Sequence, residues 1–182
     1  MYKETPSKTK VLPLSLKLYF KTLPFASNSL YRKIPHFTFR LDVSQNGITK
    51  KSIQLILALL HRHPPIQSLN LSHNKLGSSI SSIADALSTN KTLLKLYLQN
   101  TELKTEGAVA LFVSLRFNNK LVHLDVSMNK IGDKSGPAIL DLIKDNMALQ
   151  VLNMNFNQIR NGIEGIGVEL ANNNTLVELY LR

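Results

Sequence analysis

The sequence predicts an α/β solenoid, in which short parallel strands line one face and helices cover the other. Two observations predict it. A motif of the form L-x-x-L-x-L-x-x-N-x-L recurs along most of the chain, and within each repeat the apolar spacing changes from period two to helical. With 182 residues, 43% of them hydrophobic, the chain can bury a substantial core. It contains no cysteine, so packing and hydrogen bonds must hold that core without disulfides.

The repeats begin at a nearly constant interval. Aligned on the motif, their first residues are separated by 28, 27, 28, 28 and 27 residues: Thr38, Ile66, Leu93, Leu121, Leu149 and Leu176. We therefore divide the chain into a basic N-terminal cap at 1–37, partly disordered at its start, and a repeat domain at 38–182 with five repeats and an incomplete sixth. Because the sixth repeat stops in mid-strand at Arg182, we expect an open edge there that allows self-association.

Each repeat begins with a short strand. The Leu-x-Leu alternation turns every second side chain into the core, and each repeat adds one strand to a parallel sheet. We expect strands near 41–43, 69–71, 96–98, 124–126 and 152–154. Leu96, Leu124 and Leu152 occupy the same inward position in neighbouring repeats, so they should stack in one buried column.

An asparagine stands at the ninth motif position of four repeats: Asn46, Asn74, Asn129 and Asn157. Its amide both donates and accepts, so it can satisfy backbone groups where the chain leaves the strand. Thr101 replaces it in the third repeat. Because a hydroxyl has less hydrogen-bonding capacity than an amide, we predict a weaker asparagine ladder at that repeat.

The second half of each repeat has helical spacing. Apolar residues such as Ile80, Ile83 and Ala84 form the inward stripe of a helix. A polar residue closes each helix at a constant position: His63, Asn90, Asn118, Asn146 and Asn173. In the first repeat, two prolines directly after His63 stop the helix.

The 28-residue period with a full helix resembles the ribonuclease-inhibitor-like type of leucine-rich repeat, which also occurs in nucleotide-binding immune receptors and in the Ran GTPase-activating protein. The resemblance covers about residues 38–182. It implies a horseshoe with parallel strands on the concave face and helices on the convex face. For function it implies a curved binding scaffold, because solenoids serve many unrelated partners.

Most of the positive charge lies near the N-terminus. Of the net charge of +10, residues 1–37 contribute +6, from seven Lys or Arg and one Glu, and residues 38–182 contribute +4, from 15 basic and 11 acidic groups. The repeat domain is therefore only mildly basic, and no aromatic interleaving marks a nucleic-acid platform. No apolar run approaches the roughly 20 residues that span a bilayer, so we expect no transmembrane segment. The absence of cysteine fits a reducing compartment, and we expect a cytoplasmic location.

The sequence offers no convincing metal, cofactor or catalytic site. His123 and Asp125 should share the concave face, but two ligands do not make a zinc site. His61 and His63 lie beside prolines at a helix end, without a third ligand placed near them. Phosphate-binding loops are absent, and the serines that could suggest a hydrolase fill one repeated position and lack a nucleophile elbow: Ser44, Ser72 and Ser127. We expect no cofactor, metal or catalytic residue.

Candidate binding residues occupy motif positions that the core does not use. The third, fifth, seventh and eighth positions should point to the concave side, where aromatic groups and Met128 stand among hydrogen-bonding residues, as protein interfaces favour. The predicted partner-binding residues are Tyr97, His123, Asp125, Asn153, Phe156, Glu178 and Tyr180. The alternative is a solvated face with scattered aromatic residues.

The leading hypothesis for function is a non-catalytic module that binds a partner protein, for example an enzyme that it inhibits. One rival is a GTPase activator resembling the Ran activator, although no functional arginine of that family could be matched to a position here. Another is a nucleic-acid or membrane-surface binder that uses residues 1–37, whose affinity would fall steeply with salt. A cysteine-free composition rich in Asn and Lys favours a bacterial origin. A further hypothesis is that the chain is a bacterial effector, delivered into the cytosol of a host cell, that targets a host protein.

Overall fold

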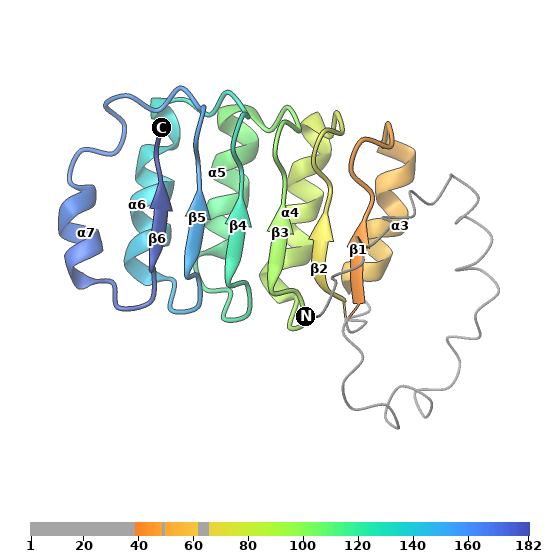
Figure 1. Ribbon diagram of the computed structural model, residues 1–182, viewed down its shortest axis with the longest axis horizontal. Helices are drawn as coiled ribbons and strands as arrows, with labels where there is room; N and C mark the ends of the chain where they lie inside the picture. Colours follow the sequence, from red (N-terminus) through yellow and green to blue (C-terminus); the bar gives the residue numbers. More distant parts are fainter. Residues whose placement is uncertain (1–38, 49, 62–65) are drawn as a thin grey trace, which may run out of the picture. The chain divides into compact units, whose positions relative to one another are not determined.

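The computed structural model describes residues 39–48, 50–61 and 66–182. The predicted cap, and His63 with the two prolines expected to stop the first helix, lie outside the described residues. Strands and helices alternate along the described chain (Figure 1). The strands are β1 (Phe39–Asp42), β2 (Ile66–Asn70), β3 (Lys95–Tyr97), β4 (His123–Asp125), β5 (Val151–Asn153) and β6 (Glu178–Tyr180). The helices are α3 (Lys50–His61), α4 (Ile80–Thr89), α5 (Lys104–Leu115), α6 (Gly136–Asp145) and α7 (Ile166–Asn172), and the 3₁₀ turns η1 (Gly77–Ser79) and η2 (Asp133–Ser135) lead into α4 and α6.

The strands form one parallel sheet in the order of the sequence, β1 to β6. Equivalent motif positions pair across neighbouring strands, so that Leu96 pairs with Leu124 and Leu124 with Leu152. The helices lie behind the sheet and leave its other face open (Figure 1). The predicted α/β solenoid is therefore confirmed. Each strand from β1 to β5 ends one residue before its predicted end, at the fifth motif position.

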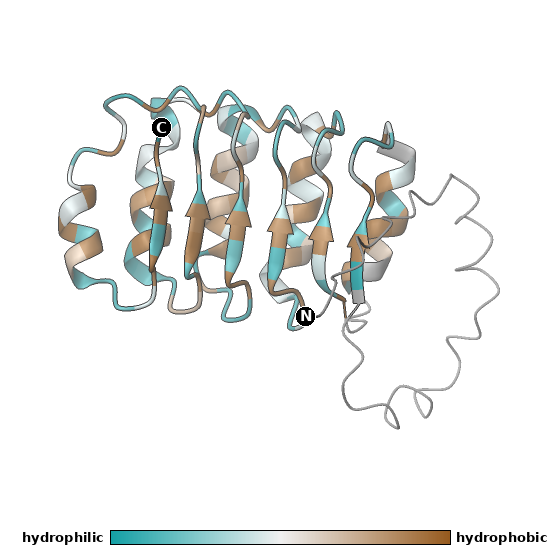
Figure 2. Ribbon diagram, viewed as in Figure 1, coloured by the Kyte–Doolittle hydropathy of each residue, from teal (hydrophilic) through white to brown (hydrophobic). Residues whose placement is uncertain are grey.

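The core lies between the sheet and the helices. The predicted leucine column is confirmed, because Leu96, Leu124 and Leu152 each have a relative exposure of 0%. Hydrophobic and hydrophilic residues alternate along strands and helices, as Figure 2 shows. The predicted helical stripes are fully buried in α4 and α5, but α7 contains no buried residue. Packing is therefore weakest at the C-terminal end of the sheet.

Asparagines connect neighbouring repeats at two places, in the turns after the strands and at the ends of the helices. At the ninth position, Asn74 Nδ2 donates to the carbonyls of Val43 and Leu71 at 3.0 and 2.9 Å, while its Oδ1 accepts from the N–H groups of Asn46 and Ile48. At the helix ends, a second ladder repeats one arrangement, in which each amide donates to a carbonyl of the preceding repeat and accepts from the N–H of the first residue of the next repeat: Asn90, Asn118, Asn146 and Asn173. Both ladders satisfy buried backbone groups.

Thr101 interrupts the first ladder, as predicted. It is fully buried, and its hydroxyl donates to the carbonyl of Leu98 at 2.9 Å and to Asn129 Oδ1 at 3.1 Å. In the described structure, no side-chain hydrogen bond from Thr101 reaches back to the second repeat. The N–H groups of Leu76 and Gly77 instead donate to the Thr101 carbonyl. Backbone bonds thus replace the amide of the missing asparagine.

Candidate functional site

The open face of the sheet presents two columns of side chains that the core does not use. The third column runs across the strands as Arg40, Ser68, Lys95, His123, Val151 and Glu178. The fifth column runs beside it as Asp42, Asn70, Tyr97, Asp125, Asn153 and Tyr180. None of these side chains is buried. The predicted orientation of both columns is confirmed.

Asp125 and Asn153 are held in place by a local hydrogen-bond network. Ser127 donates its N–H and its hydroxyl to Asp125 Oδ1 at 2.9 and 2.6 Å. Asn153 Nδ2 donates to Asp125 Oδ2 at 3.0 Å. All three donors are neutral, so the carboxylate keeps its negative charge in a fixed orientation at the sheet surface.

Tyr97 and His123 pack against each other in the middle of the sheet. Their ring centroids are 5.0 Å apart with an interplanar angle of 45°, a favourable aromatic geometry. Burial lowers the pKa of His123 below its usual 6.5, with a further lowering by Lys95, while Asp125 and Glu178 partly oppose the shift. The ring is therefore mainly neutral at pH 7.

Glu178 and Tyr180 form a pair on β6, the last strand. The Tyr180 hydroxyl donates to Glu178 Oε2 at 2.7 Å, and this bond together with the glutamate charge raises the pKa of Tyr180. Tyr180 nevertheless exposes 44% of its surface. The pair adds an acid and an accessible aromatic ring to the C-terminal part of the open face.

Phe156 lies beyond the strand, in the turn three residues after β5. The eighth motif position has positive φ in every complete repeat: Gln45, His73, Asn100, Met128 and Phe156. Phe156 has φ 56° and is 60% exposed, and Met128 has φ 58° and is 44% exposed. Bulky apolar residues rarely adopt this left-handed conformation, and the turn does not require their side chains. The Arg182 guanidinium lies 6.0 Å from the centre of the Phe156 ring.

The predicted patch therefore has two parts. Four of the predicted residues are neighbours in the two columns. The Tyr97 ring packs against His123, and Asn153 donates a hydrogen bond to Asp125. Glu178 and Tyr180 adjoin them on β6. Phe156 lies at the edge of the open face, in the row of turns after the strands, rather than on a strand. Met128 has the equivalent position one repeat earlier; the sequence predicts it as an exposed apolar residue of this face, although it is not among the predicted partner-binding residues.

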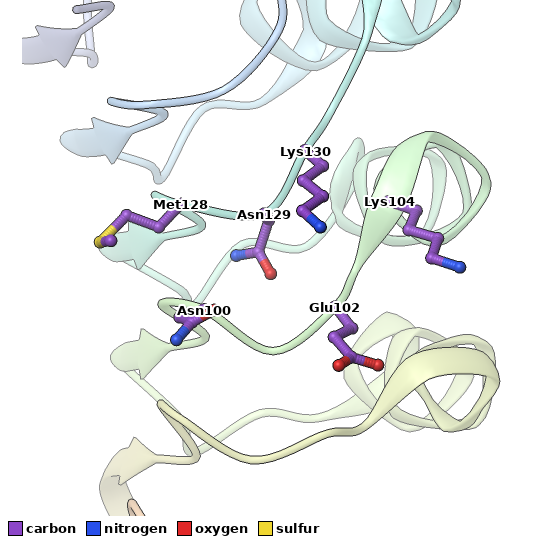
Figure 3. A pocket seen from close by; sticks show the side chains of 6 residues that line it. All are labelled: Asn100, Glu102, Lys104, Met128, Asn129 and Lys130. Carbon is purple, nitrogen blue, oxygen red and sulfur yellow. The ribbon is translucent and has the colours of Figure 1, made fainter.

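A shallow hollow lies in the turns that follow β3 and β4. It has a volume of about 280 Å³ and is lined by Asn100, Glu102, Lys104, Met128, Asn129 and Lys130. Figure 3 shows Met128 and Asn100 on the strand side, and Lys104 beside a helix. The amide of Asn129 is occupied by the ladder, since it donates to Leu98 and accepts from Thr101. The side chains of Asn100, Glu102, Lys104, Met128 and Lys130 therefore remain as the other lining groups of the hollow.

Within the described residues, no group of three or more His, Asp or Glu is arranged to hold a metal ion. None of the described helices is both long and apolar enough to cross a membrane.

Comparison with known proteins identifies the repeats. Residues 89–112 and 117–140 match the family described as "Leucine Rich repeat", and residues 65–86 match "Leucine Rich Repeat". The chain is 34% identical over 149 residues to "NACHT, LRR and PYD domains-containing protein 5" of Mus musculus. It is 29% identical over 125 residues to "Protein CARMIL" of Dictyostelium discoideum. These alignments cover 79% and 65% of this chain but 13% and 12% of the relatives, so the chain spans about one eighth of their length.

A solved structure has the same fold. "Leiomodin-1 Actin-Binding Site 2 (ABS2)" superposes with a TM-score of 0.64 at 19% identity, over 74% of this chain and 80% of that chain. The chain therefore contains leucine-rich repeats and folds as a leucine-rich repeat solenoid.

Proposed function

We propose that the repeat domain is a non-catalytic interaction module that binds a protein partner through the open face of its sheet. The observation that carries this proposal is the pair Met128 and Phe156. Both expose large apolar side chains on a backbone in the left-handed conformation. Glycine or asparagine would adopt that conformation with a smaller loss of stability. A residue that is both strained and exposed is better explained by contact with a partner than by stability.

The surroundings of this pair support the same proposal. Tyr97 and Tyr180 place aromatic rings among amides and carboxylates, which is the composition of the energetic centre of protein interfaces. Hydrogen bonds hold Asp125 and Asn153 in one geometry, which reduces the entropy lost on binding. A structure of the same fold is named for an actin-binding site, which supports a protein as the kind of partner.

Narrower hypotheses rest on the sequence alone and stay predictions. They are inhibition of a partner enzyme, GTPase activation, delivery as a bacterial effector into a cytosol, and self-association through the edge of β6. Each has a direct assay: inhibition of the captured partner, GTP hydrolysis, secretion from a bacterial host, and light scattering over a dilution series.

The proposal is tested by measuring the affinity of a captured partner for variants of the full chain. The double variant Tyr97→Ala with Phe156→Ala should lose at least about 2 kcal/mol of binding free energy, which is roughly thirtyfold in Kd. The control is Phe117→Ala, because Phe117 is 76% exposed in the turn after α5, away from the open face. An unchanged affinity of the double variant would move the interface elsewhere.

A further inference from the structure

The open face carries the same hydrogen-bonded scaffold twice, three strands apart. The fifth column reads Asp, Asn, Tyr over β1 to β3 and again over β4 to β6. Asp42 Oδ1 accepts from the Ser44 N–H and hydroxyl at 2.9 and 2.7 Å, and Asn70 Nδ2 donates to Oδ2 at 3.1 Å. These bonds reproduce those of Asp125. We call the side chains of the two columns on β1–β3 the first half and those on β4–β6 the second half.

The third column gives these equivalent scaffolds opposite charge. Arg40 lies on β1 and Lys95 on β3, so with Asp42 the first half has a net charge of +1 from two cations and one anion. In the second half the equivalent positions are His123, which is mainly neutral, and Glu178, so with Asp125 the net charge is −2 from two anions. Arg182 lies outside both columns, near the Phe156 ring. The open face therefore changes sign across its middle.

These charges are not neutralised within the described structure. Its salt bridges join Lys75 to Glu102, and Arg116 to Asp141 and Asp145, all outside the two columns. Lys95 and Glu178 are both exposed, and neutral donors hold Asp42 and Asp125. Such a face attracts a partner of complementary polarity and disfavours others.

We infer that the occupant is an extended segment of the partner that crosses the strands, with an acidic side chain over the first half and a basic one over the second. This inference rests on the proposed function. Lys95 and Glu178 occupy equivalent positions three strands apart, which corresponds to about 14 Å at roughly 4.8 Å per strand. An extended chain advances about 3.4 Å per residue, so four residues cover that span.

The number of residues also fits the alternation of side chains in an extended chain. Residues four apart point to the same side, so both charged side chains can face the sheet together. The residue midway between them faces the same side and lies over His123 and Val151, which favours an apolar group there. The expected recognition element is therefore an acidic residue and a basic residue four positions apart, with an apolar residue between them.

The inference is tested with a displayed library of random twelve-residue peptides, selected against the full chain and two charge-reversal variants. Peptides from the unaltered chain should be enriched in an acidic and a basic residue four positions apart. Lys95→Glu should select two basic residues at that spacing, and Glu178→Lys two acidic ones. A peptide selected on the unaltered chain should bind each variant at least tenfold more weakly. Lys144→Glu, an exposed change on α6, is the matched control and should leave the selected pattern unchanged.

Three outcomes would overturn the inference: no enriched peptide, enriched peptides without the charged pair, or the same peptides recovered from both charge-reversal variants. Melting curves of the three variants confirm that the comparison is between folded chains. If a captured partner still depends on Tyr97 and Phe156 while the peptides show no charged pair, the charge pattern falls and the proposed function stands. If the partner does not depend on Tyr97 and Phe156 and the peptides show no charged pair, both the proposed function and the charge pattern are wrong.

Discussion

Phe156 combines an exposed apolar side chain with a left-handed backbone, and one substitution should change stability and binding in opposite directions. A non-glycine residue in this conformation reduces the free energy of unfolding by roughly 1–2 kcal/mol. Asparagine reduces it by less, because its short side chain can form local hydrogen bonds. Phe156→Asn should therefore raise the free energy of unfolding by about 1 kcal/mol while weakening partner binding. Denaturant titration measures the first effect. Val177→Asn is the control, since Val177 is 77% exposed and is absent from the residues with positive φ; equal stabilisation by both changes would contradict the account.

Thr101 leaves the asparagine ladder incomplete, and a single substitution should complete it. In Thr101→Asn, the new amide can donate to the carbonyls of Leu71 and Leu98, as Asn74 does one repeat earlier. We expect a gain of about 1 kcal/mol in the free energy of unfolding. The reverse change in the next repeat, Asn129→Thr, should destabilise the chain. A loss of stability in Thr101→Asn would show that the buried site lacks room for the amide.

His123 should make the stability of the chain depend on pH. Because burial lowers its pKa in the folded state, protonation favours the unfolded chain. The stabilising contribution is complete above the unfolded pKa of about 6.5 and is lost as the pH falls below it. NMR titration of the imidazole should give a pKa under 6.5, and His123→Asn should flatten the stability profile between pH 6.5 and 5. A pKa at or above 6.5 would contradict the assigned burial.

At the scale of the repeat, the sequence predicted the fold because its signals agree. The motif period fixes the parallel order of the strands, and the change to helical spacing marks each helix. The loop before α7 could not be predicted in this way. There the Asp133 carboxylate accepts from the N–H groups of Arg160, Asn161 and Gly162, and a Cβ at Gly136 would lie 1.5 Å from the Gly162 carbonyl oxygen. Such contacts depend on two repeats meeting in space and leave no periodic signal.

The leucine column gives a graded test of packing between elements. Leu124→Ala should cost about 2–5 kcal/mol, because Leu124 is fully buried between neighbouring leucines. Leu179→Ala removes the equivalent leucine of β6, which is only partly buried, and should cost clearly less. Equal costs in denaturant titrations would mean that the C-terminal end of the sheet is packed as tightly as its centre.

At the scale of the whole molecule, the sequence predicted which positions face away from the core but not how their side chains interact. The Tyr97 and His123 contact, the Asp125 and Asn153 network and the edge position of Phe156 all depend on the register of adjacent strands and on turn geometry. Charge counts along the chain also concealed the change of sign across the open face. That change becomes visible once residues about 28 positions apart are placed side by side.

We propose that the open face, and not the helices or their turns, contacts the partner. Hydroxyl-radical footprinting of the full chain, with and without a captured partner, tests it most directly, because methionine and aromatic side chains oxidise readily when exposed. The chain offers matched pairs: Met128 and Phe156 at the edge of the open face, and Met147 and Phe117 in the turns after α6 and α5, with exposures of 44%, 60%, 67% and 76%. We predict that the partner protects Met128 and Phe156 and leaves Met147 and Phe117 oxidised at their free rates. Protection of Met147 and Phe117, with Met128 and Phe156 unchanged, would place the interface at the turns of the helices and not on the open face.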